Sequence, residues 1–299
     1  MHKNSQQFLE YLKEHVVVAD GATGTMLQFS GLPTDSCVEE WNLSHPEVVR
    51  QIHQAYYEAG ADFVETNTFG GNRIRLRLHG MEDKVAEINQ RAVEHVQSVC
   101  PSGKFVAGSV GPSGEYLEPV GTMTYDILYE VFIEQITALI ETGVDLLCIE
   151  TMTDINELKA ALTAAQTIQK DIPVVASMTF EKSATGFHTM MGTLPEQAIK
   201  EIQNMNPVAI GSNCGHGAPE MIELMAEFKK YTSLPLVAQA NAGIPVWEDG
   251  KHTFPETSAE RGRYTEKLLD LGVRIIGGCC GTTPEHIRSI RSSVDKFSA

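Results

Sequence analysis

Short apolar runs recur along the chain, and each one ends in small or polar residues. Eight such runs occupy residues 16–20, 61–68, 105–111, 145–151, 173–180, 209–214, 236–241 and 273–279. Apolar runs of this length, bounded by turn residues, are typical of buried β-strands. The sequence therefore predicts eight buried strands.

Between these runs, apolar residues recur at the three- and four-residue spacing of amphipathic helices. Predicted helices cover residues 46–59, 83–99, 124–141, 154–168, 195–205, 219–231, 257–271 and 284–294, and an extra helix at 5–14 precedes the first run. Strands and helices that alternate at intervals of roughly 30 to 45 residues predict an α/β fold, a (β/α)8 TIM barrel formed by residues 1–299 as one domain. A doubly wound open sheet is the structural alternative.

The last run leads into the segment Gly277-Gly278-Cys279-Cys280-Gly281, where two neighbouring cysteines stand between a strand and a helix start. Successive strand residues point to opposite faces, so both sulfurs reach one point only where the backbone leaves the regular pleat, which glycines permit. Cys214 ends another run. Three thiols that converge from two strand ends would bind a thiophilic ion such as zinc and leave one position open for a substrate. We therefore predict a metal site formed by Cys214, Cys279 and Cys280.

Other interpretations of the cysteines stay open. A vicinal disulfide between Cys279 and Cys280 is geometrically poor, because disulfides prefer Cα atoms about 4.4 to 6.8 Å apart. Buried inert cysteines are commoner in general than metal ligands, and this interpretation is favoured for Cys37, Cys100 and Cys148. His216 lies two residues from Cys214, but a solvated or supporting histidine is favoured there over a ligand.

Acids and small polar residues also end several of the other runs: Asp20-Gly21, Glu65-Thr66-Asn67-Thr68, Glu150-Thr151 and Asn241. In a barrel, the carboxyl ends of all the strands face one shared site. Placing such groups there is costly unless they bind something. We therefore expect these strand ends to line a ligand site.

The composition narrows the classes of partner. The chain has 39 acidic and 23 basic residues, a formal net charge of −16, which argues against nucleic acid or an anionic membrane as a partner. No run of about 18 apolar residues and no signal-peptide pattern is found. Six cysteines in 299 residues are too sparse for a disulfide scaffold. We therefore expect a cytoplasmic protein with free thiols.

The chain resembles the homocysteine S-methyltransferase family in five segments: Asp20 to Leu27, Glu65 to Phe69, Gly211 to Cys214, Asn241 to Gly243 and Gly277 to His286. The combination of Asn-Cys with Gly-Gly-Cys-Cys-Gly is highly specific. Within the family, the likeness is strongest to the homocysteine-binding portion of cobalamin-dependent methionine synthase; betaine-dependent and S-methylmethionine-dependent enzymes are relatives. The resemblance implies a (β/α)8 barrel whose catalytic zinc is held by Cys214, Cys279 and Cys280.

The resemblance also implies substrate contacts at the strand ends. Asp20 and Glu150 would pair with the ammonium group of homocysteine, and the backbone near Gly21, with Thr66, would hold its amino-acid end. Asp-Gly is also a turn signal on its own, and threonine is common at strand ends. Asn241 is a further candidate, close to the metal when no substrate is present.

The implied activity is zinc-dependent transfer of a methyl group to the thiol of homocysteine, which gives methionine. A free thiol has a pKa of about 8.5, and zinc would remove its proton and leave the sulfur nucleophilic. Because folate and cobalamin modules are not found here, we expect the methyl donor to be a methylcorrinoid on a separate partner protein. S-methylmethionine is the alternative donor, and a zinc- or thiol-binding subunit of a larger complex acting on another thiol is a third possibility. Thr151 stands where the betaine enzyme has a tyrosine, which weakens the case for betaine.

Overall fold

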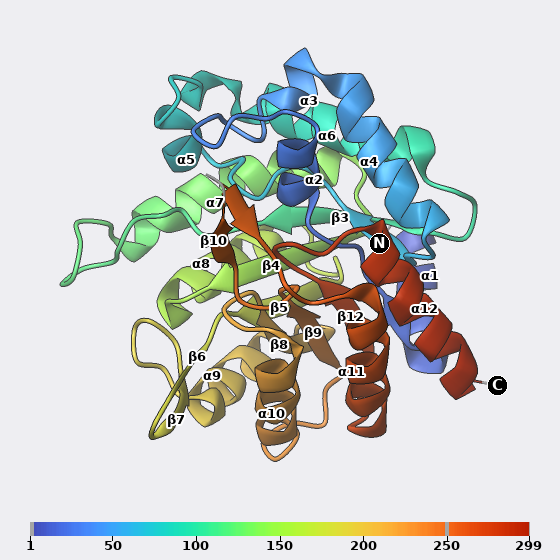
Figure 1. The fold of residues 1–299 in the computed structure, drawn as a ribbon. Coiled ribbons are helices and arrows are strands. Elements are labelled where there is room, and N and C mark those ends of the chain that lie inside the picture. The colour runs from blue at the N-terminus through green and yellow to red at the C-terminus, as the bar shows by residue number, and fades with distance from the viewer. Residues whose placement is uncertain (1–2, 249–250, 299) are drawn as a thin grey trace.

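A computed structural model describes residues 3–248 and 251–298. Within these residues, eight parallel strands form one sheet in the order β1, β12, β9, β8, β5, β4, β3, β2. They are β1 (Val17–Val18), β2 (Phe63–Glu65), β3 (Phe105–Val110), β4 (Leu146–Met152), β5 (Val174–Met178), β8 (Ala209–Asn213), β9 (Leu236–Ala240) and β12 (Ile275–Gly278). The sheet curls into a nearly closed barrel with helices around it (Figure 1). The predicted (β/α)8 barrel is confirmed.

The helices that follow the strands begin and end close to the predicted positions. They are α4 (Pro46–Glu58), α6 (Val85–Val99), α7 (Tyr125–Thr142), α8 (Ile155–Ile168), α9 (Pro195–Ile202), α10 (Ala218–Phe228), α11 (Ser258–Asp270) and α12 (Pro284–Ser298). Capping explains several bounds, because the side chains of Thr124, Asp154 and Thr257 accept N–H groups of the first turn. No helix in the described part of the chain has the length and apolar character needed to span a bilayer.

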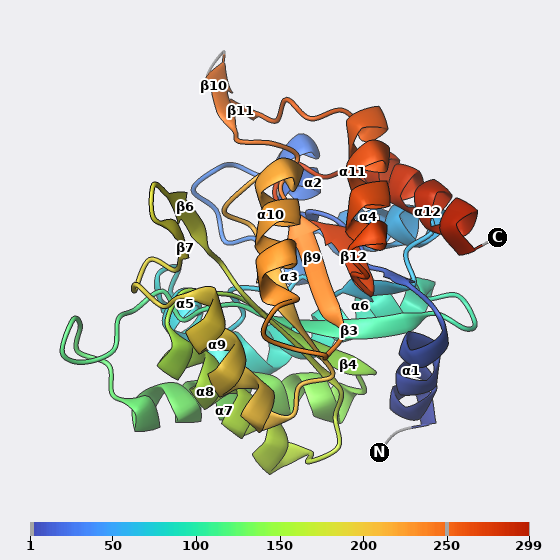
Figure 2. The ribbon, with the colours of Figure 1, turned by 90° about the horizontal axis from the view of Figure 1, so that it is seen from below.

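Several short elements were not predicted. They are α2 (Thr23–Phe29), α3 (Trp41–Ser44), α5 (Arg73–Arg77) and the hairpins formed by β6 (Glu181–Ser183) with β7 (Gly186–His188) and by β10 (Val246–Glu248) with β11 (Lys251–Thr253). Elements this short show no clear hydrophobic period, which is why the sequence pattern missed them. The 3-10 turns η1 (Glu82–Lys84) and η2 (Gln203–Met205) fall at the ends of helices predicted over 83–99 and 195–205. The three helices and both hairpins follow carboxyl ends of barrel strands, so they surround the same end of the barrel (Figure 2).

Helix α1 (Lys3–Glu14) closes the opposite end of the barrel, as Figure 2 shows. Phe8 is fully buried, and its ring meets those of Phe63 and Phe105 edge to face at centroid distances of 6.2 and 5.3 Å. The hydroxyl of Ser5 donates to the carbonyl of Asp145 at 2.8 Å. The barrel interior below the site is therefore filled by an apolar cluster to which α1 contributes.

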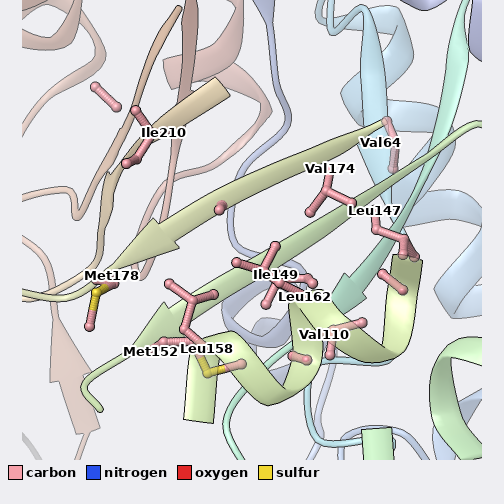
Figure 3. Close-up of a cluster of buried hydrophobic side chains, with 14 of the residues drawn as sticks. Val64, Val110, Leu147, Ile149, Met152, Leu158, Leu162, Val174, Met178 and Ile210 are labelled. Carbon is pink, nitrogen blue, oxygen red and sulfur yellow. The ribbon is translucent and has the colours of Figure 1, made fainter. Parts of the chain in front are cut away.

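The outer faces of the strands pack against the helices. Figure 3 shows Leu147 and Ile149 of β4 beside Leu158 and Leu162 of α8, in a cluster that also includes Val174 of β5. All five side chains are at least 95% buried. Strands buried on both faces read as continuous apolar runs, which explains why the sequence located them well.

Carboxylates help to close the seam between β1 and β2. The N–H of Asp62 donates to the carbonyl of Val18 at 2.7 Å, and the carboxylate of Asp62 accepts the N–H of Val18 at 2.8 Å. Nearer the carboxyl end, the carboxylate of Asp20 accepts the N–H of Glu65 at 3.0 Å. Side chains thus satisfy backbone donors that a regular strand pair would satisfy with carbonyls.

Candidate metal and substrate site

The three predicted cysteines meet at the carboxyl ends of their strands. Cys214 follows β8 directly, and Cys279 and Cys280 follow β12. The three sulfur atoms all lie within 4.8 Å of one another. The structure therefore brings together the thiols that the sequence placed at two separate strand ends.

A tight turn explains how neighbouring cysteines reach one point. The carbonyl of Cys279 accepts both the N–H of Thr282 at 3.0 Å and its hydroxyl at 2.7 Å, so the chain reverses directly after β12. Gly281 has φ 79° in this turn, and a Cβ there would clash with Phe254. Cys214 has φ 59°, which is uncommon for a residue other than glycine. Such backbone strain persists where the surroundings impose it, often at functional sites.

The three thiols shift one another's pKa values. Hydrogen bonds from Cys279 and Cys280 lower the pKa of Cys214. The same contact with Cys214 raises the pKa of Cys279 well above its usual value and also raises the pKa of Cys280. The cluster thus favours one thiolate and keeps the other two thiols protonated. A soft dication bound at this point would displace the protons and let all three sulfurs ionise. This donor set fits an ion of the zinc type with a fourth position open.

The sulfurs lie on the wall of a cavity of about 310 Å³ at the carboxyl end of the barrel. This volume suits a small molecule. The lining includes six of the predicted site residues: Gly21, Thr66, Glu150, Cys214, Cys279 and Cys280. Metal-ligand candidates and substrate-binding candidates therefore share one cavity.

Glu150 is held in this cavity by a local irregularity of β4. The strand register shifts between Ile149 and Met152, and Thr151 has φ 61°. The Glu150 carboxylate accepts the Ser109 hydroxyl at 2.6 Å and the amide of Asn213 at 2.9 Å. Burial, and then the charge of Glu65, raise the pKa of Glu150 well above its usual value. A cation placed beside this carboxylate would relieve that cost.

Glu65 is a second cavity-lining carboxylate, to which the sequence analysis assigned no individual role. Its Oε1 accepts the side-chain amide of Gln239 at 2.9 Å, and its charge contributes to the raised pKa of Glu150. Burial, and then the charge of Asp20, raise the pKa of Glu65 to about 7. The carbonyl of Gln239 in turn accepts the N–H of Cys214 at 3.1 Å. The carboxylate pair and the thiol cluster are thus joined through Gln239.

The sequence model that describes the homocysteine S-methyltransferases matches residues 17–294 of this chain. The chain belongs to the homocysteine S-methyltransferase family. The match extends over all eight barrel strands, so the resemblance drawn from five short segments is confirmed across the fold.

Two bacterial methionine synthases are similar to this chain along its whole length. Methionine synthases of Mycobacterium leprae and Mycobacterium tuberculosis are 33% and 32% identical to it over 310 aligned positions, which cover 98% of this chain. The alignments cover 25% and 26% of those proteins. The chain therefore spans about a quarter of the length of these relatives.

Solved structures of other methyltransferases share the fold. The metallated form of the Escherichia coli homocysteine methyltransferase MmuM has a TM-score of 0.79 at 23% identity, over 97% of this chain and 99% of that protein. A methyltransferase from Methanosarcina mazei has a TM-score of 0.64 at 13% identity, over the full length of both. At these identities the likeness shows a common architecture.

Two residues to which the family resemblance assigns substrate contacts, Asp20 and Asn241, lie outside the described lining of the cavity. Asp20 is 1% exposed, its carboxylate accepts the N–H of Glu65, and burial raises its pKa well above the usual value. Asn241 is 5% exposed, and its side chain contributes to lowering the pKa of Cys214. Its Oδ1 has no hydrogen-bond partner within the described residues.

The remaining family candidates, Gly21 and Thr66, do line the cavity. A Cβ at Gly21 would clash with Thr282 and Tyr56, so glycine alone fits there. The hydroxyl of Thr66 hydrogen-bonds with that of Thr68 at 2.6 Å and accepts the N–H of Ser109 at 3.1 Å. The Thr66 side chain is therefore fixed before any ligand arrives.

His216 and the other cysteines occupy separate positions. The Nε2 atom of His216 accepts the N–H of Lys182 at 2.8 Å, so this ring supports the β6–β7 hairpin. Cys148 is buried in the inner apolar cluster and Cys100 is partly buried. Cys37 is buried as well, but it lines the cavity, and its thiol donates to Glu39 at 3.5 Å.

Proposed function

We propose that this chain transfers a methyl group to the thiol of homocysteine and so produces methionine, with the whole chain acting as one catalytic barrel. The single observation that carries the proposal is the arrangement of one cavity: three convergent thiols lie beside the carboxylates of Glu65 and Glu150. The thiols suit a metal that can bind a substrate sulfur, and the carboxylates suit a substrate ammonium. Family membership supports the same acceptor.

We propose zinc as the metal, held by Cys214, Cys279 and Cys280. The all-sulfur donor set and the lowered pKa of Cys214 support this choice. When bound, zinc would supply the charge that keeps a thiol deprotonated near neutral pH while its sulfur stays nucleophilic. Ligation needs reduced cysteines, and the six cysteines are free. We therefore place the reaction in a reducing compartment, the cytoplasm.

The protein's own residues orient the acceptor in this proposal. Glu150 binds the ammonium group, and its bonds to Ser109 and Asn213 fix the carboxylate in position. The backbone near Gly21 and the fixed hydroxyl of Thr66 lie on the cavity wall, where they would receive the substrate carboxylate. Holding both ends of the amino acid leaves its sulfur as the group free to react.

The transfer balances as a simple displacement. The thiol proton of homocysteine passes to solvent, and the sulfur lone pair forms the new bond to the methyl carbon. The bond between that carbon and the donor breaks, and its electron pair leaves with the donor. The donor must approach from the carboxyl end of the barrel, because α1 closes the other end.

For the donor, we propose a methylcorrinoid carried by a separate protein. The likeness to methionine synthases along 98% of the chain supports this donor. S-methylmethionine is the second candidate donor, because buried carboxylates in the cavity would favour a sulfonium cation. A third candidate function is a metal- and thiol-binding subunit that acts on another thiol within a larger complex.

The donor can be tested by incubating zinc-loaded protein and homocysteine with S-methylmethionine, free methylcobalamin or betaine, and measuring methionine. Slow turnover with free methylcobalamin alone is expected. Rapid turnover with S-methylmethionine alone would overturn the corrinoid donor and keep the acceptor. Formation of methionine from none of the three, together with tight homocysteine binding, would favour the subunit of a larger complex.

A further inference from the structure

We propose that Arg261 is the positioning residue of the thiol cluster: its guanidinium fixes the backbone that holds the three cysteines and so sets how tightly they bind a metal. This inference rests on the proposed zinc site. Arg261 belongs to α11 and is absent from the described cavity lining. It is 1% exposed, and an arginine is rarely enclosed to this degree unless it is paired.

The charge of Arg261 is paired inside the fold. Its Nε donates to the carboxylate of Glu256 at 2.5 Å, and the two side chains are 2% and 5% exposed. The backbone of Glu256 is fixed as well, since its N–H donates to the carbonyl of Ala242 at 3.0 Å and its carbonyl lies 3.0 Å from Nε2 of His286. A buried ion pair gains little stability over an apolar pair of similar shape, so its presence calls for another role.

The other two nitrogens of the guanidinium bind the ends of two neighbouring strands. Nη2 donates to the carbonyls of Ala240 and Asn241 at 3.2 and 2.7 Å, and Nη1 donates to the carbonyl of Gly277 at the longer distance of 3.5 Å. Ala240 ends β9, and Gly277 lies within β12. One planar group thus spans both strands while it pairs with a carboxylate, which the rigid fork of arginine permits and the single amine of lysine does not.

One of these carbonyls leads directly to the neighbouring cysteines. The carbonyl of Ala240 accepts the N–H of Cys279 at 2.9 Å as well as the guanidinium of Arg261. Two residues further on, the N–H of Ala242 donates to the carbonyl of Cys280 at 2.9 Å. The segment 240–242 therefore holds the backbone of both cysteines, and Arg261 binds two of its three carbonyls.

The same segment reaches the third cysteine. The N–H of Asn241 donates to the carbonyl of His216 at 3.0 Å, in the turn that follows Cys214. All three candidate ligands therefore depend on one backbone segment whose position Arg261 sets. Replacing a group that orients metal ligands typically lowers metal affinity about 10- to 100-fold.

The test measures two properties of the full chain: zinc affinity, by competition with a chromophoric chelator, and the absorption spectrum after substitution with cobalt(II). Arg261→Lys keeps a positive charge beside Glu256 but cannot bind both strands. It should weaken zinc binding about tenfold or more and shift the cobalt bands, which report the arrangement of the sulfur ligands. The circular dichroism spectrum of the metal-free variant should not change.

Arg274→Lys is the matched control. Arg274 also donates to three carbonyls, those of Leu12, Lys13 and His15, and it precedes the same strand β12, but at the closed end of the barrel. Zinc affinity of this variant should stay within about twofold of the wild-type value, and its cobalt bands should not move.

Each other outcome has a definite meaning. Wild-type zinc affinity and cobalt bands in Arg261→Lys would overturn the proposal. An equal loss of affinity in Arg274→Lys would also overturn it, because it would show a general loosening of the fold. If Arg261→Lys does not fold, Glu256→Gln, which keeps an oxygen for Nε but removes the charge that orients it, must weaken zinc binding and shift the bands. Failure of the wild type to bind zinc would instead refute the proposed metal site and, with it, the proposed function.

Discussion

At the end of the barrel that α1 closes, Phe8 packs edge to face against Phe63 and Phe105. At the other end, carboxylates and thiols face one cavity, burial raises the pKa of Glu65, and Cys214 adopts a positive φ. The closed end is satisfied without a ligand, whereas the open end holds groups whose charged forms need a cation. The closed end therefore stabilises the fold, whereas the charged groups at the open end lower its stability and are available to bind a ligand.

The largest effect is expected from Phe8→Ala, at the closed end. It should lower the free energy of unfolding by about 3 to 5 kcal/mol, because it removes a fully buried aromatic ring and leaves a cavity. Zinc content of the folded protein should not change. Denaturant titration followed by circular dichroism measures the loss. The matched control is Phe297→Ala, since Phe297 is 55% exposed, and an equal loss there would contradict the argument.

His53, a buried histidine in the helical layer, tests whether loss of stability at low pH is confined to the open end of the barrel. His53 of α4 is fully buried, both ring nitrogens lack a hydrogen-bond partner within the described residues, and burial lowers its pKa to about 3. A histidine with a depressed folded-state pKa loses stability as the pH falls from about 6.5 towards that value.

His53→Leu should therefore gain stability over wild type by about 3 kcal/mol more at pH 4 than at pH 7. Unfolding titrations at the two pH values measure this difference. His79→Leu, at an exposed position, is the control and should show no such change. A pH-independent difference for His53→Leu would mean that the ring gains a partner on protonation.

Glu65→Gln should have the opposite pH dependence. Because the folded-state pKa of Glu65 is raised to about 7, its carboxylate destabilises the metal-free protein as the pH rises from about 4.5 through 7. The variant should therefore be more stable than wild type by about 3 kcal/mol at pH 8, and the gain should vanish near pH 4. Thermal unfolding of the metal-free protein at both pH values measures it. A loss of stability at pH 8 would show that Glu65 supports the fold.

The smallest effect on stability is expected at the metal ligands. Alanine in place of Cys214, Cys279 or Cys280 should change the stability of the metal-free protein by about 1 kcal/mol or less, because the thiols lie at strand ends beside a cavity. The same variants should lose the bound zinc, which elemental analysis measures. Cys37→Ala, in the same cavity but outside the cluster, should keep it. Full zinc retention in one of the three variants would remove that cysteine from the ligand set.

The sequence predicted the strands and the cysteine cluster for physical reasons that were local. Strands buried on both faces gave apolar runs, and the glycines around Cys279 and Cys280 marked a break in the pleat. Glu65 accepts a hydrogen bond from Gln239, which is 174 positions away, and no local pattern contains that contact. The family resemblance implies a substrate contact at Asp20, and in the structure its carboxylate accepts the N–H of Glu65 across the seam, a contact that the sequence did not predict. α1 was located, yet its place as the plug of the barrel depends on packing that only the assembled strands create.

The seam between β1 and β2 also has a consequence for local opening of the barrel. The two strands are held together partly by the side chains of Asp20 and Asp62. On its other side, β1 pairs with β12 only through Val17 and Val18. Gly21 follows β1, and Glu65 ends β2. An amino acid that contacts both residues would therefore bridge the seam between the two strands. Binding of the amino acid would then also stabilise the closed form of the barrel. Amide hydrogens along this joint would exchange more slowly once the acceptor is in place.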